Sequence, residues 1–207
     1  MSLRKSANPP TDDDDLIRRF VATFRTLDGL HSWQSEPLPA ELAAEPDSDD
    51  WVPVRWQPAA APTDREHLAP IYERLPRHHR LPARLPALYE RLVLSYRWLR
   101  VHLETVMLLA NPPGPTLSGL ADEIFCDPVL INTLIPAGFV PFGKVSGGGY
   151  DPMCFDLNSM KRDDCPIIQI EHESALCHDR IGQTWQRFSS FRELMFDTID
   201  RANANGA

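Results

Sequence analysis

Apolar residues recur every three or four positions in several parts of the chain, and this spacing predicts helices. One such helix lies in LIRRFVATFRTLDGL, which begins after a run of four aspartates and can end at Gly29. We interpret the aspartates as solvated residues that favour the positive end of the helix dipole. A longer apolar stripe runs through LPALYERLVLSYRWLRVHLETVMLLA, from Leu85 to Ala110, and a Pro-Pro-Gly sequence stops it.

Several polar side chains interrupt this long predicted helix without breaking its apolar stripe. His102 adjoins the stripe, and we interpret it as a structural residue, not as a ligand. The charged residues off the stripe are expected to be solvated: Arg91, Arg97, Arg100 and Glu104. Two shorter helices follow, in which Ser118 is expected to cap GLADEIF and Asp127 with Pro128 to start VLINTLI.

Beyond Pro136 the pattern changes to the alternation of strands. FVPFGKV leads into a glycine turn, DPMCFDL alternates after it, and a polar loop separates it from PIIQIEHE. SALCHDR is expected to be a further strand of the same meander. Ser190 and Glu193 then form a capping-box pattern in front of FRELMFDTID. Together the elements predict an α+β fold with a mainly antiparallel sheet of about four to six strands.

The prolines suggest how the chain is divided. Many of the twenty lie before Pro86, so residues 1–80 are predicted to be a Pro-rich extension with one helix, which wraps around or links to an α+β domain of residues 81–207. Within the extension, Trp51 and Trp56 lie in a short edge strand or a packed arm. An exposed aromatic peptide for a partner is the alternative, although tryptophan is more often buried.

Composition and charge narrow the classes of function. The 29 acidic and 21 basic residues give a net charge of −8, which argues against nucleic acid or an anionic membrane as partner and suits a basic protein. There is no apolar run of transmembrane length and no apolar leader, so a cytosolic location is expected. The cysteines have no CxxC spacing and are expected to be reduced thiols: Cys126, Cys154, Cys165 and Cys177.

The glycine-rich stretch SGGGYDPMCFDLN, from Ser146 to Asn158, is the first candidate for chemistry. A phosphate-binding loop needs a helix N-terminus after the glycines, and here a strand pattern follows. We therefore predict that the three glycines make a hairpin turn through positive φ angles and that Pro152 starts the next strand.

Two further alternatives concern metal binding and nucleophilic catalysis. EHESALCHD contains several ligand types, although no known zinc spacing is present: Glu171, His172, Glu173, Cys177, His178 and Asp179. A metal site could still assemble from Asp151, Asp156, His172 and His178. Cys154 or Cys177 could act as a nucleophile beside a histidine, but nothing near either cysteine in the sequence activates it.

The C-terminal half resembles the SUKH superfamily, which includes Syd and the fungal Smi/Knr cell-wall regulators. The resemblance rests on the strand ending in PFG, the glycine-rich turn, YDPMCFDLN, PIIQIEHE and the closing SFRELM helix, with LPARLPALYERL similar to an early helix of the family. It implies an α+β fold and a non-enzymatic, protein-binding role. Many bacterial members are immunity proteins that neutralise a toxin, and fungal members are interaction hubs.

These expectations combine into one leading hypothesis and two alternatives. The leading hypothesis is an immunity protein that binds a basic toxin, such as a nuclease, without a cofactor or metal. The residues expected to contact the partner are Tyr150, Asp151 and Asp156 with the turn glycines Gly147, Gly148 and Gly149. A regulatory or scaffold protein is the second possibility, and an enzyme with the metal site above is the third.

Overall fold

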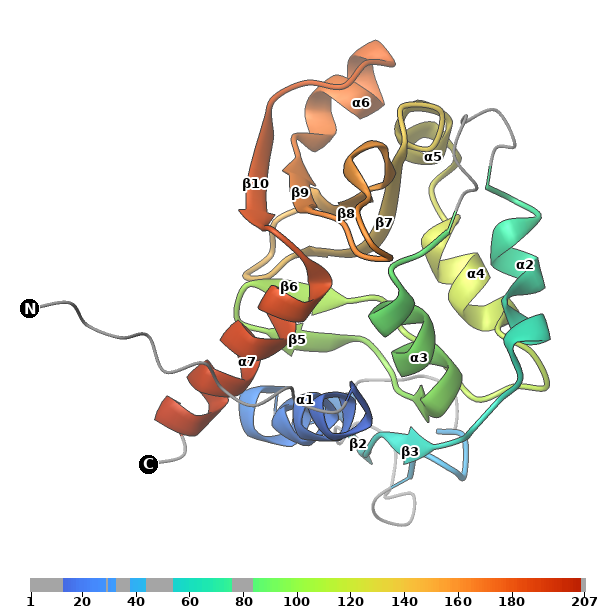
Figure 1. Cartoon of the computed structure of the whole chain (residues 1–207), viewed down its shortest axis with the longest axis vertical. Coiled ribbons are helices and arrows are strands. Elements are labelled where there is room, and N and C mark those ends of the chain that lie inside the picture. The colour runs from blue at the N-terminus through green and yellow to red at the C-terminus, as the bar shows by residue number, and fades with distance from the viewer. Residues whose placement is uncertain (1–12, 29, 33–37, 44–53, 76–83, 206–207) are drawn as a thin grey trace, which may run out of the picture.

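A six-stranded antiparallel sheet lies at the centre of the fold (Figure 1). The computed structural model describes residues 13–28, 30–32, 38–43, 54–75 and 84–205. The strands lie side by side in the order of the sequence: β5 (Val101–Leu103), β6 (Val106–Leu108), β7 (Phe139–Val145), β8 (Pro152–Asp156), β9 (Ile167–Ile170) and β10 (Thr184–Phe188). Every neighbouring pair is antiparallel. The predicted α+β class with its antiparallel sheet is therefore confirmed.

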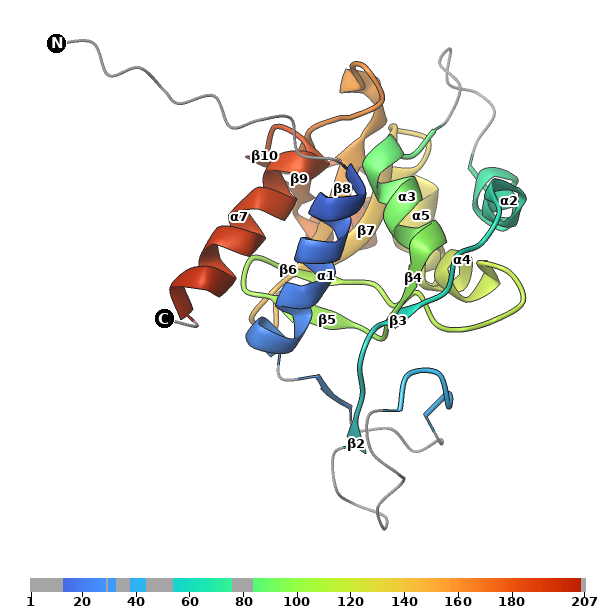
Figure 2. The ribbon, with the colours of Figure 1, turned by 60° about the horizontal axis from the view of Figure 1, so that its bottom comes forward.

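Helices cover both faces of this sheet. Helices α1 (Asp13–Asp28), α3 (Ala87–Ser95) and α7 (Phe191–Asn205) lie together on one face (Figure 2). Helices α5 (Pro128–Leu134) and α6 (His172–His178) contact each other over the opposite face. The remaining elements are η1 (Arg65–Leu68), α2 (Ala69–Tyr72), α4 (Ser118–Ile124), η2 (Leu157–Ser159), and the paired short strands β1 (His31–Ser32) with β2 (Val54–Arg55) and β3 (Ala59–Ala60) with β4 (Tyr96–Arg97). Among the described residues, no helix combines the length and apolar character needed to cross a membrane.

Alternation along the central strands sends side chains into two separate cores. Phe155 of β8 lies opposite Ile167 of β9, and both belong to the larger core under α1, α3 and α7. Their neighbours Cys154 and Ile168 also lie opposite each other, but they belong to the smaller core under α5 and α6. This division follows from the two-residue period of a strand, since successive side chains point to opposite faces.

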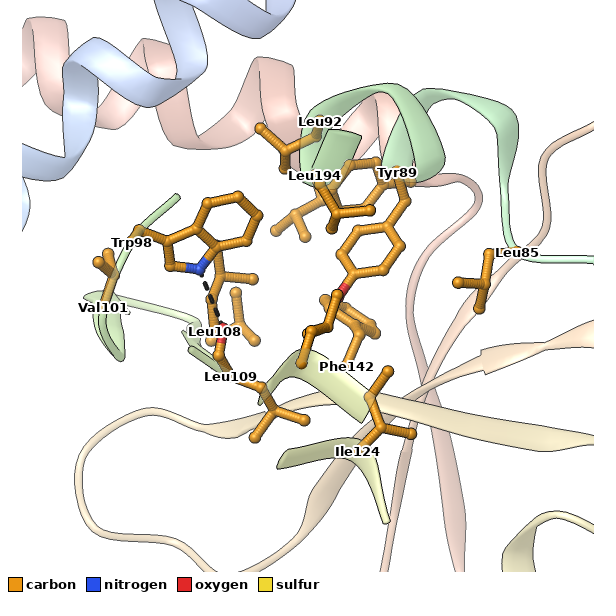
Figure 3. Packing of buried hydrophobic residues seen from close by; sticks show 14 of the residues in the cluster. Leu85, Tyr89, Leu92, Trp98, Val101, Leu108, Leu109, Ile124, Phe142 and Leu194 are labelled. Carbon is orange, nitrogen blue, oxygen red and sulfur yellow. Dashed lines mark hydrogen bonds between the residues drawn. The ribbon is translucent and has the colours of Figure 1, made fainter. Parts of the chain in front are cut away.

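The larger core is rich in aromatic rings (Figure 3). The rings of Phe142 and Phe155 stack with their centroids 4.3 Å apart, and Tyr89 packs edge-on against Phe155 at 5.0 Å. Nearby, the buried indole of Trp98 donates a hydrogen bond from Nε1 to the carbonyl of Leu109 at 2.9 Å. The hydroxyl of Tyr89 is buried without a hydrogen-bond partner among the described residues, and this burial raises its pKa.

The predicted N-terminal helix is confirmed as α1, and its apolar face belongs to the larger core. Leu16, Phe20 and Phe24 are fully buried there, and the Phe20 ring lies 6.2 Å from that of Phe191 in α7. The predicted boundary at residue 80 therefore runs between two stretches that share one core. Trp56, from the same N-terminal stretch, is also buried, whereas Trp51 lies outside the described residues.

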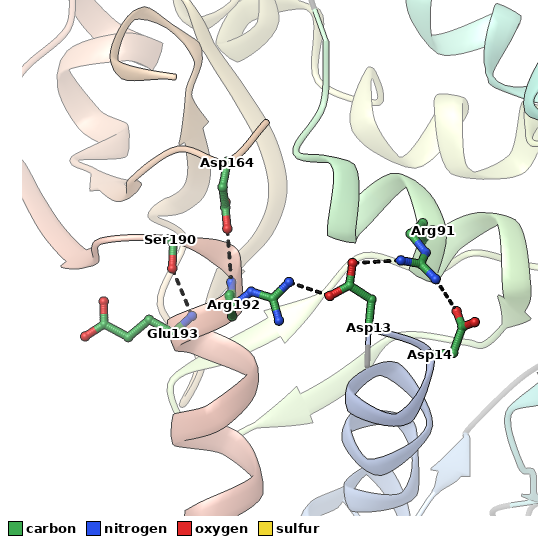
Figure 4. A network of polar contacts seen from close by, with 7 residues as sticks. All are labelled: Asp13, Asp14, Arg91, Asp164, Ser190, Arg192 and Glu193. Carbon is green, nitrogen blue, oxygen red and sulfur yellow. Dashed lines mark hydrogen bonds and ion pairs between the residues drawn. The ribbon is translucent and has the colours of Figure 1, made fainter. Parts of the chain in front are cut away.

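The acidic start of α1 also joins three helices through ion pairs (Figure 4). Asp13 accepts hydrogen bonds from Arg91 of α3 at 2.7 Å and from Arg192 of α7 at 2.5 Å. Arg91 also donates to Asp14 at 2.5 Å. The hydrogen bond from Arg192 is the main reason that the pKa of Asp13 lies below its ordinary value of 3.8. Helix capping is thus only part of what these aspartates do, and the prediction that Arg91 would simply be solvated is wrong.

The long helix predicted from Leu85 to Ala110 is wrong beyond Ser95. Helix α3 ends there, and the rest of the segment forms β4, β5 and β6. Arg97, expected in solvent, is 2% exposed. It donates to the carbonyls of Val93 and Tyr96 at 2.7 and 3.0 Å, and thereby caps the end of α3.

Two long-range interactions explain why the helix stops. The amide of Asn111 donates to the same carbonyls, those of Val93 and Tyr96, at 2.9 and 2.7 Å. In addition, β4 pairs with β3 from the N-terminal stretch. The following hairpin turns at Glu104, which has a φ of +52°. Helical spacing could not reveal partners that lie outside the segment.

The helix caps predicted at Asp127 and Ser190 are present in the structure. Asp127 caps α5 through the amides of Val129 and Leu130, with Pro128 in the first turn, as predicted. The Ser190 hydroxyl accepts from the amide of Glu193 at 3.0 Å, which confirms that part of the capping box, while the Glu193 carboxylate binds the amide of Ser189.

Two predicted details were wrong, and one strand was missed. Ser118 lies inside α4 and provides no side-chain cap, and SALCHDR lies mainly in helix α6 and not in a strand. The sixth strand, β10, follows it and was not predicted. A Cβ at Gly182, just before β10, would lie 2.5 Å from the Cβ of Ser174, so a larger residue there would displace its neighbours.

We predict that Asp13→Asn lowers the free energy of unfolding by about 1–2 kcal/mol, because it removes the carboxylate that pairs with two helices. Asp15→Asn is the matched control, since Asp15 is in the same helical turn and pairs with the exposed Arg18 three residues away. The Asp15→Asn variant should lose about 0.5 kcal/mol of its free energy of unfolding. Urea denaturation measures both, and equal losses would show that the Asp13 pairs add no stability.

We also predict that Tyr89→Phe leaves the free energy of unfolding unchanged or raises it by up to about 1 kcal/mol, because the hydroxyl is buried without a partner. Tyr72→Phe is the contrasting variant. The Tyr72 hydroxyl donates to Glu90 and accepts from the amide of Leu85, so its removal should cost about 1–3 kcal/mol. Calorimetric or urea unfolding of both variants tests the difference, and a larger loss at Tyr89 would contradict it.

Candidate functional site

The glycine-rich turn joins β7 to β8 at one end of the sheet, as the sequence predicted. Gly147 and Gly148 have φ angles of +82° and +88°, a conformation that glycine adopts without strain. Gly149 does not have a positive φ angle, so the prediction is wrong for the third glycine. A Cβ at Gly147 or Gly148 would meet no atom within 4 Å, so these two residues lie in open space. Strand β8 follows the turn, whereas a helix follows the glycine loop of a dinucleotide-binding fold.

Tyr150 stands at the end of this turn and is the most exposed large hydrophobic residue that the structure describes. Its exposed fraction is 70%, compared with 42% for Val129 and 38% for Leu176. Its ring lies beside the imidazole of His172, with the two ring centroids 5.6 Å apart and the ring planes at 48° to each other. A tyrosine held in water in this way combines a large apolar area with a hydroxyl, which is typical of residues at protein interfaces.

The next residue, Asp151, ties the turn to the first residue of α6. Its Oδ1 accepts hydrogen bonds from the backbone amide of His172 at 3.1 Å and from Nδ1 of the same residue at 2.7 Å. Since a carboxylate only accepts, Nδ1 must carry the proton, and Nε2 is directed away from the pair. The carboxylate therefore fixes both the start of α6 and the orientation of the His172 ring beside Tyr150.

The other oxygen of Asp151 connects the turn to two more strands. Oδ2 accepts from the side-chain amide of Gln169 in β9 at 2.6 Å. The carbonyl oxygen of Gln169 accepts in turn from Nε of Arg187 in β10 at 2.7 Å. We call the chain of Asp151, His172, Gln169 and Arg187 the polar row. Its hydrogen bonds fix the start of β8, strands β9 and β10, and the start of α6 relative to one another next to Tyr150.

Burial and hydrogen bonding act in opposite directions on the pKa of Asp151. Partial burial raises it, but the hydrogen bonds from His172 and Gln169 together lower it by more, so the pKa lies below the ordinary value of 3.8. The charged form of Asp151 is thus the one that the folded protein favours. This carboxylate serves as an acceptor that organises its neighbours and is only partly accessible to a partner.

Asp156 does not join the other predicted contact residues. It lies at the far end of β8, roughly 20 Å along the strand from Tyr150 at the usual rise per residue. There its side chain accepts the amide of Asn158 at 3.1 Å and caps η2. The predicted contact residues therefore lie in two separate places. The glycines, Tyr150 and Asp151 lie at one end of β8, and Asp156 lies at the other.

The alternative metal site is not assembled from its four predicted ligands. Asp151 and His172 do meet, but Asp156 lies at the other end of β8 and His178 ends α6, about 9 Å along the helix axis from His172. Within the described ranges, no group of three or more His, Cys, Asp or Glu side chains has an arrangement that could hold a metal ion. The remaining candidates, Glu171, Glu173, Cys177 and Asp179, add no such group.

The two cysteines considered as nucleophiles lie in very different environments. Cys154 is fully buried in the smaller core, and burial raises its pKa, which disfavours the reactive thiolate. Cys177 is exposed on α6. All four cysteines are free thiols, as predicted.

Two residues of the polar row were missed by the sequence reasoning, namely Gln169 and Arg187. Gln169 stands inside a strand pattern that otherwise predicts core residues, and Arg187 belongs to the strand that was not predicted. Their partners lie eighteen positions away in the chain. No local motif connects residues at such a distance, so only the register of three paired strands could have found them.

The chain was compared with protein-family models, with curated proteins and with solved structures, and none of these comparisons found a match.

We predict that Asp151→Asn lowers the free energy of unfolding by about 1–2 kcal/mol at neutral pH. Because the folded pKa is lowered, the carboxylate stabilises the fold above the pKa of the unfolded chain, near 3.9, and this contribution is lost as the pH falls through the folded value. The difference between wild type and variant should therefore shrink below about pH 4. Urea titrations across this range test it, with Asp156→Asn as the reference substitution at the other end of β8. A difference that stays constant with pH would contradict it.

Proposed function

We propose that this protein is a non-enzymatic binding module whose contact surface centres on Tyr150. The observation that carries the proposal is the pairing of a 70% exposed tyrosine with a rigid support. Exposing so much apolar area has a cost in water, which contact with a partner would remove. Tyrosine is also among the residues enriched at the energetically dominant positions of interfaces.

The polar row supports the same proposal through its rigidity. Hydrogen bonds connect Asp151 to α6, β9 and β10, so the base of the turn is already ordered before any partner arrives. A surface ordered in advance loses less conformational entropy on binding than a mobile one. The glycines remain the adaptable part of this surface, since a Cβ at Gly147 or Gly148 would meet no atom within 4 Å.

The charge of the chain favours a basic partner. With a net charge of −8, the protein would attract a basic protein at long range and speed the encounter, less so at high salt. Toxins that act on nucleic acids carry such basic surfaces, because they bind phosphate backbones. Together with the resemblance to the SUKH superfamily, this favours an immunity protein that neutralises a toxin, acting inside the cell.

A regulatory or scaffold protein is the second candidate, because the same resemblance includes interaction hubs. The two candidates differ in the partner that is recovered from the native host. A toxin encoded beside this gene, or a secreted toxin captured by the tagged protein, supports the first. Recovery of housekeeping proteins supports the second.

We predict that Tyr150→Ala weakens binding to the toxin encoded by the neighbouring gene by about tenfold to a hundredfold, a loss expected for a central interface tyrosine. Isothermal titration of the purified, catalytically inactivated toxin with wild type and variant measures this. The free energy of unfolding should not change, because the Tyr150 side chain is 70% exposed.

The matched control is Val129→Ala, which shortens another exposed apolar side chain on α5. It should bind as the wild type does. If the wild type binds no toxin in a panel that includes the product of the neighbouring gene, the immunity role is wrong. If Tyr150→Ala binds with unchanged affinity, the contact surface lies elsewhere.

A further inference from the structure

Helix α6 continues the surface around Tyr150 along the outside of the molecule (Figure 1). The ring of Tyr150 lies beside that of His172, with the centroids 5.6 Å apart. Leu176 follows His172 by four residues, and side chains at this spacing are neighbours on a helix, about 5–6 Å apart. Leu176 is 38% exposed, which makes it one of three exposed large apolar residues in the described chain. Tyr150, His172 and Leu176 thus form a continuous row, which we call the α6 row.

The packing of α6 explains why this row faces water. Ala175 is fully buried in the smaller core, together with residues of α5. Consecutive side chains of a helix are separated by about 100° around its axis, so Leu176 is turned away from the side that Ala175 buries. Its apolar area remains in contact with water, and a partner that covered it would gain the free energy of burial.

The polar groups beside the α6 row are hydrogen-bond acceptors. Glu173 lies three residues before Leu176 and Asp179 three residues after it, and both residues are exposed. Neither carboxylate makes a hydrogen bond or an ion pair with another described residue. Within the row, Nδ1 of His172 donates to Asp151, so Nε2 of the neutral imidazole is a third acceptor. A partner for this surface therefore has to supply donors.

We propose that the α6 row is the docking site for an amphipathic basic helix of the protein partner, and this proposal rests on the binding role proposed for Tyr150. Apolar side chains of the partner helix would cover Tyr150 and Leu176, and its lysines or arginines would pair with Glu173 and Asp179. Basic side chains suit such a site, because their long stems pack on apolar surface while their charged ends reach the carboxylates.

The geometry of α6 favours a helix over a strand as the occupant. The backbone amides and carbonyls around Leu176 bond within the helix, so they are not free to pair with an added strand. Recognition must therefore use side chains. A partner helix that lies along α6 presents its own side chains at spacings of three and four residues, which matches the spacing of His172, Glu173 and Leu176.

The charge around the row favours a basic partner over other classes. From Glu171 to Gln183 the chain contains three carboxylates and one arginine, Arg180, which follows the end of α6. Nucleic acids and anionic lipids would place phosphate groups beside these carboxylates, and like charges repel. A second copy of this chain would bring a further net charge of −8. A basic helix meets opposite charge both at the row and over the whole protein.

Titration with designed peptides tests the docking site without the toxin. The probe is a fluorescently labelled amphipathic peptide of leucine and lysine, and fluorescence anisotropy measures its affinity. The wild type should bind it, and more weakly at high salt. A peptide with glutamate in place of every lysine should not bind. Leu176→Ala, and the double variant Glu173→Lys with Asp179→Lys, should each weaken binding of the leucine–lysine peptide about threefold to tenfold.

The matched control is the double variant Glu66→Lys with Glu73→Lys, which changes the net charge by the same amount. Both residues are exposed, and they flank α2, which packs against α4 and not against α6. This control should bind the leucine–lysine peptide as the wild type does. Far-UV circular dichroism verifies that every variant is folded.

Two results would overturn the proposal. One is a wild type that does not bind the leucine–lysine peptide. The other is an equal loss in the α6 charge variant and in the control, because only the overall charge would then matter. If an α6 variant does not fold, an NMR titration of the wild type decides instead. The amides of Glu173, Leu176 and Asp179 should shift when the peptide is added, and unchanged signals would overturn the docking site.

Tyr150→Ala in the same titration separates this proposal from the proposed function. If Tyr150→Ala weakens binding and the α6 variants do not, the docking site on α6 is wrong and the surface at Tyr150 stands. If the α6 variants weaken binding and Tyr150→Ala does not, the docking site on α6 is supported and the contact surface is not centred on Tyr150.

Discussion

Burial of the Phe191 ring is the constraint on which the arrangement of the layers depends. The ring contacts Phe20 of α1, Tyr89 of α3, and Phe142 and Phe155 of the two central strands. One side chain thus joins three helices to the sheet. Complete burial of a phenylalanine stabilises a fold by about 1.5–3 kcal/mol, and edge-to-face contacts add to this. Asp164 strengthens the same junction, because its carboxylate accepts the amide of Phe191 at 3.0 Å and so holds the start of α7 in place.

The candidate binding surface depends on this junction only indirectly. The aromatic core and helix α7 order one end of β8, β9 and β10, and the polar row orders the end that carries Tyr150. Different interactions stabilise the two ends. Burial of aromatic rings stabilises the end near α7, and hydrogen bonds between charged and neutral side chains stabilise the end that carries Tyr150. A change at Tyr150 can therefore alter recognition without disturbing the core, while a change at Asp151 affects both the turn and α6.

Local chemistry made part of this fold predictable from sequence. Asp127 with Pro128, and Ser190 with Glu193, marked helix starts because a cap involves residues only a few positions apart. The strands around the glycine turn were predictable because alternation is also local. The segment after Ser95 was not, because its conformation depends on β3 and on Asn111, which lie outside it. At the candidate site, Tyr150 and the glycines could be named in advance. The partners of Asp151 in β9 and α6 could not, since strand register brings them together.

The ion pair between Asp13 and Arg192 spans 179 positions of the chain. Helix α1 is synthesised well before α7, yet they lie side by side in the folded protein (Figure 2). The larger core is therefore incomplete until α7 has been synthesised. Until then the apolar face of α1 is exposed to water or bound by a chaperone. A chain that lacks α7 would expose Phe20 and its neighbours, because α7 covers that side of the larger core.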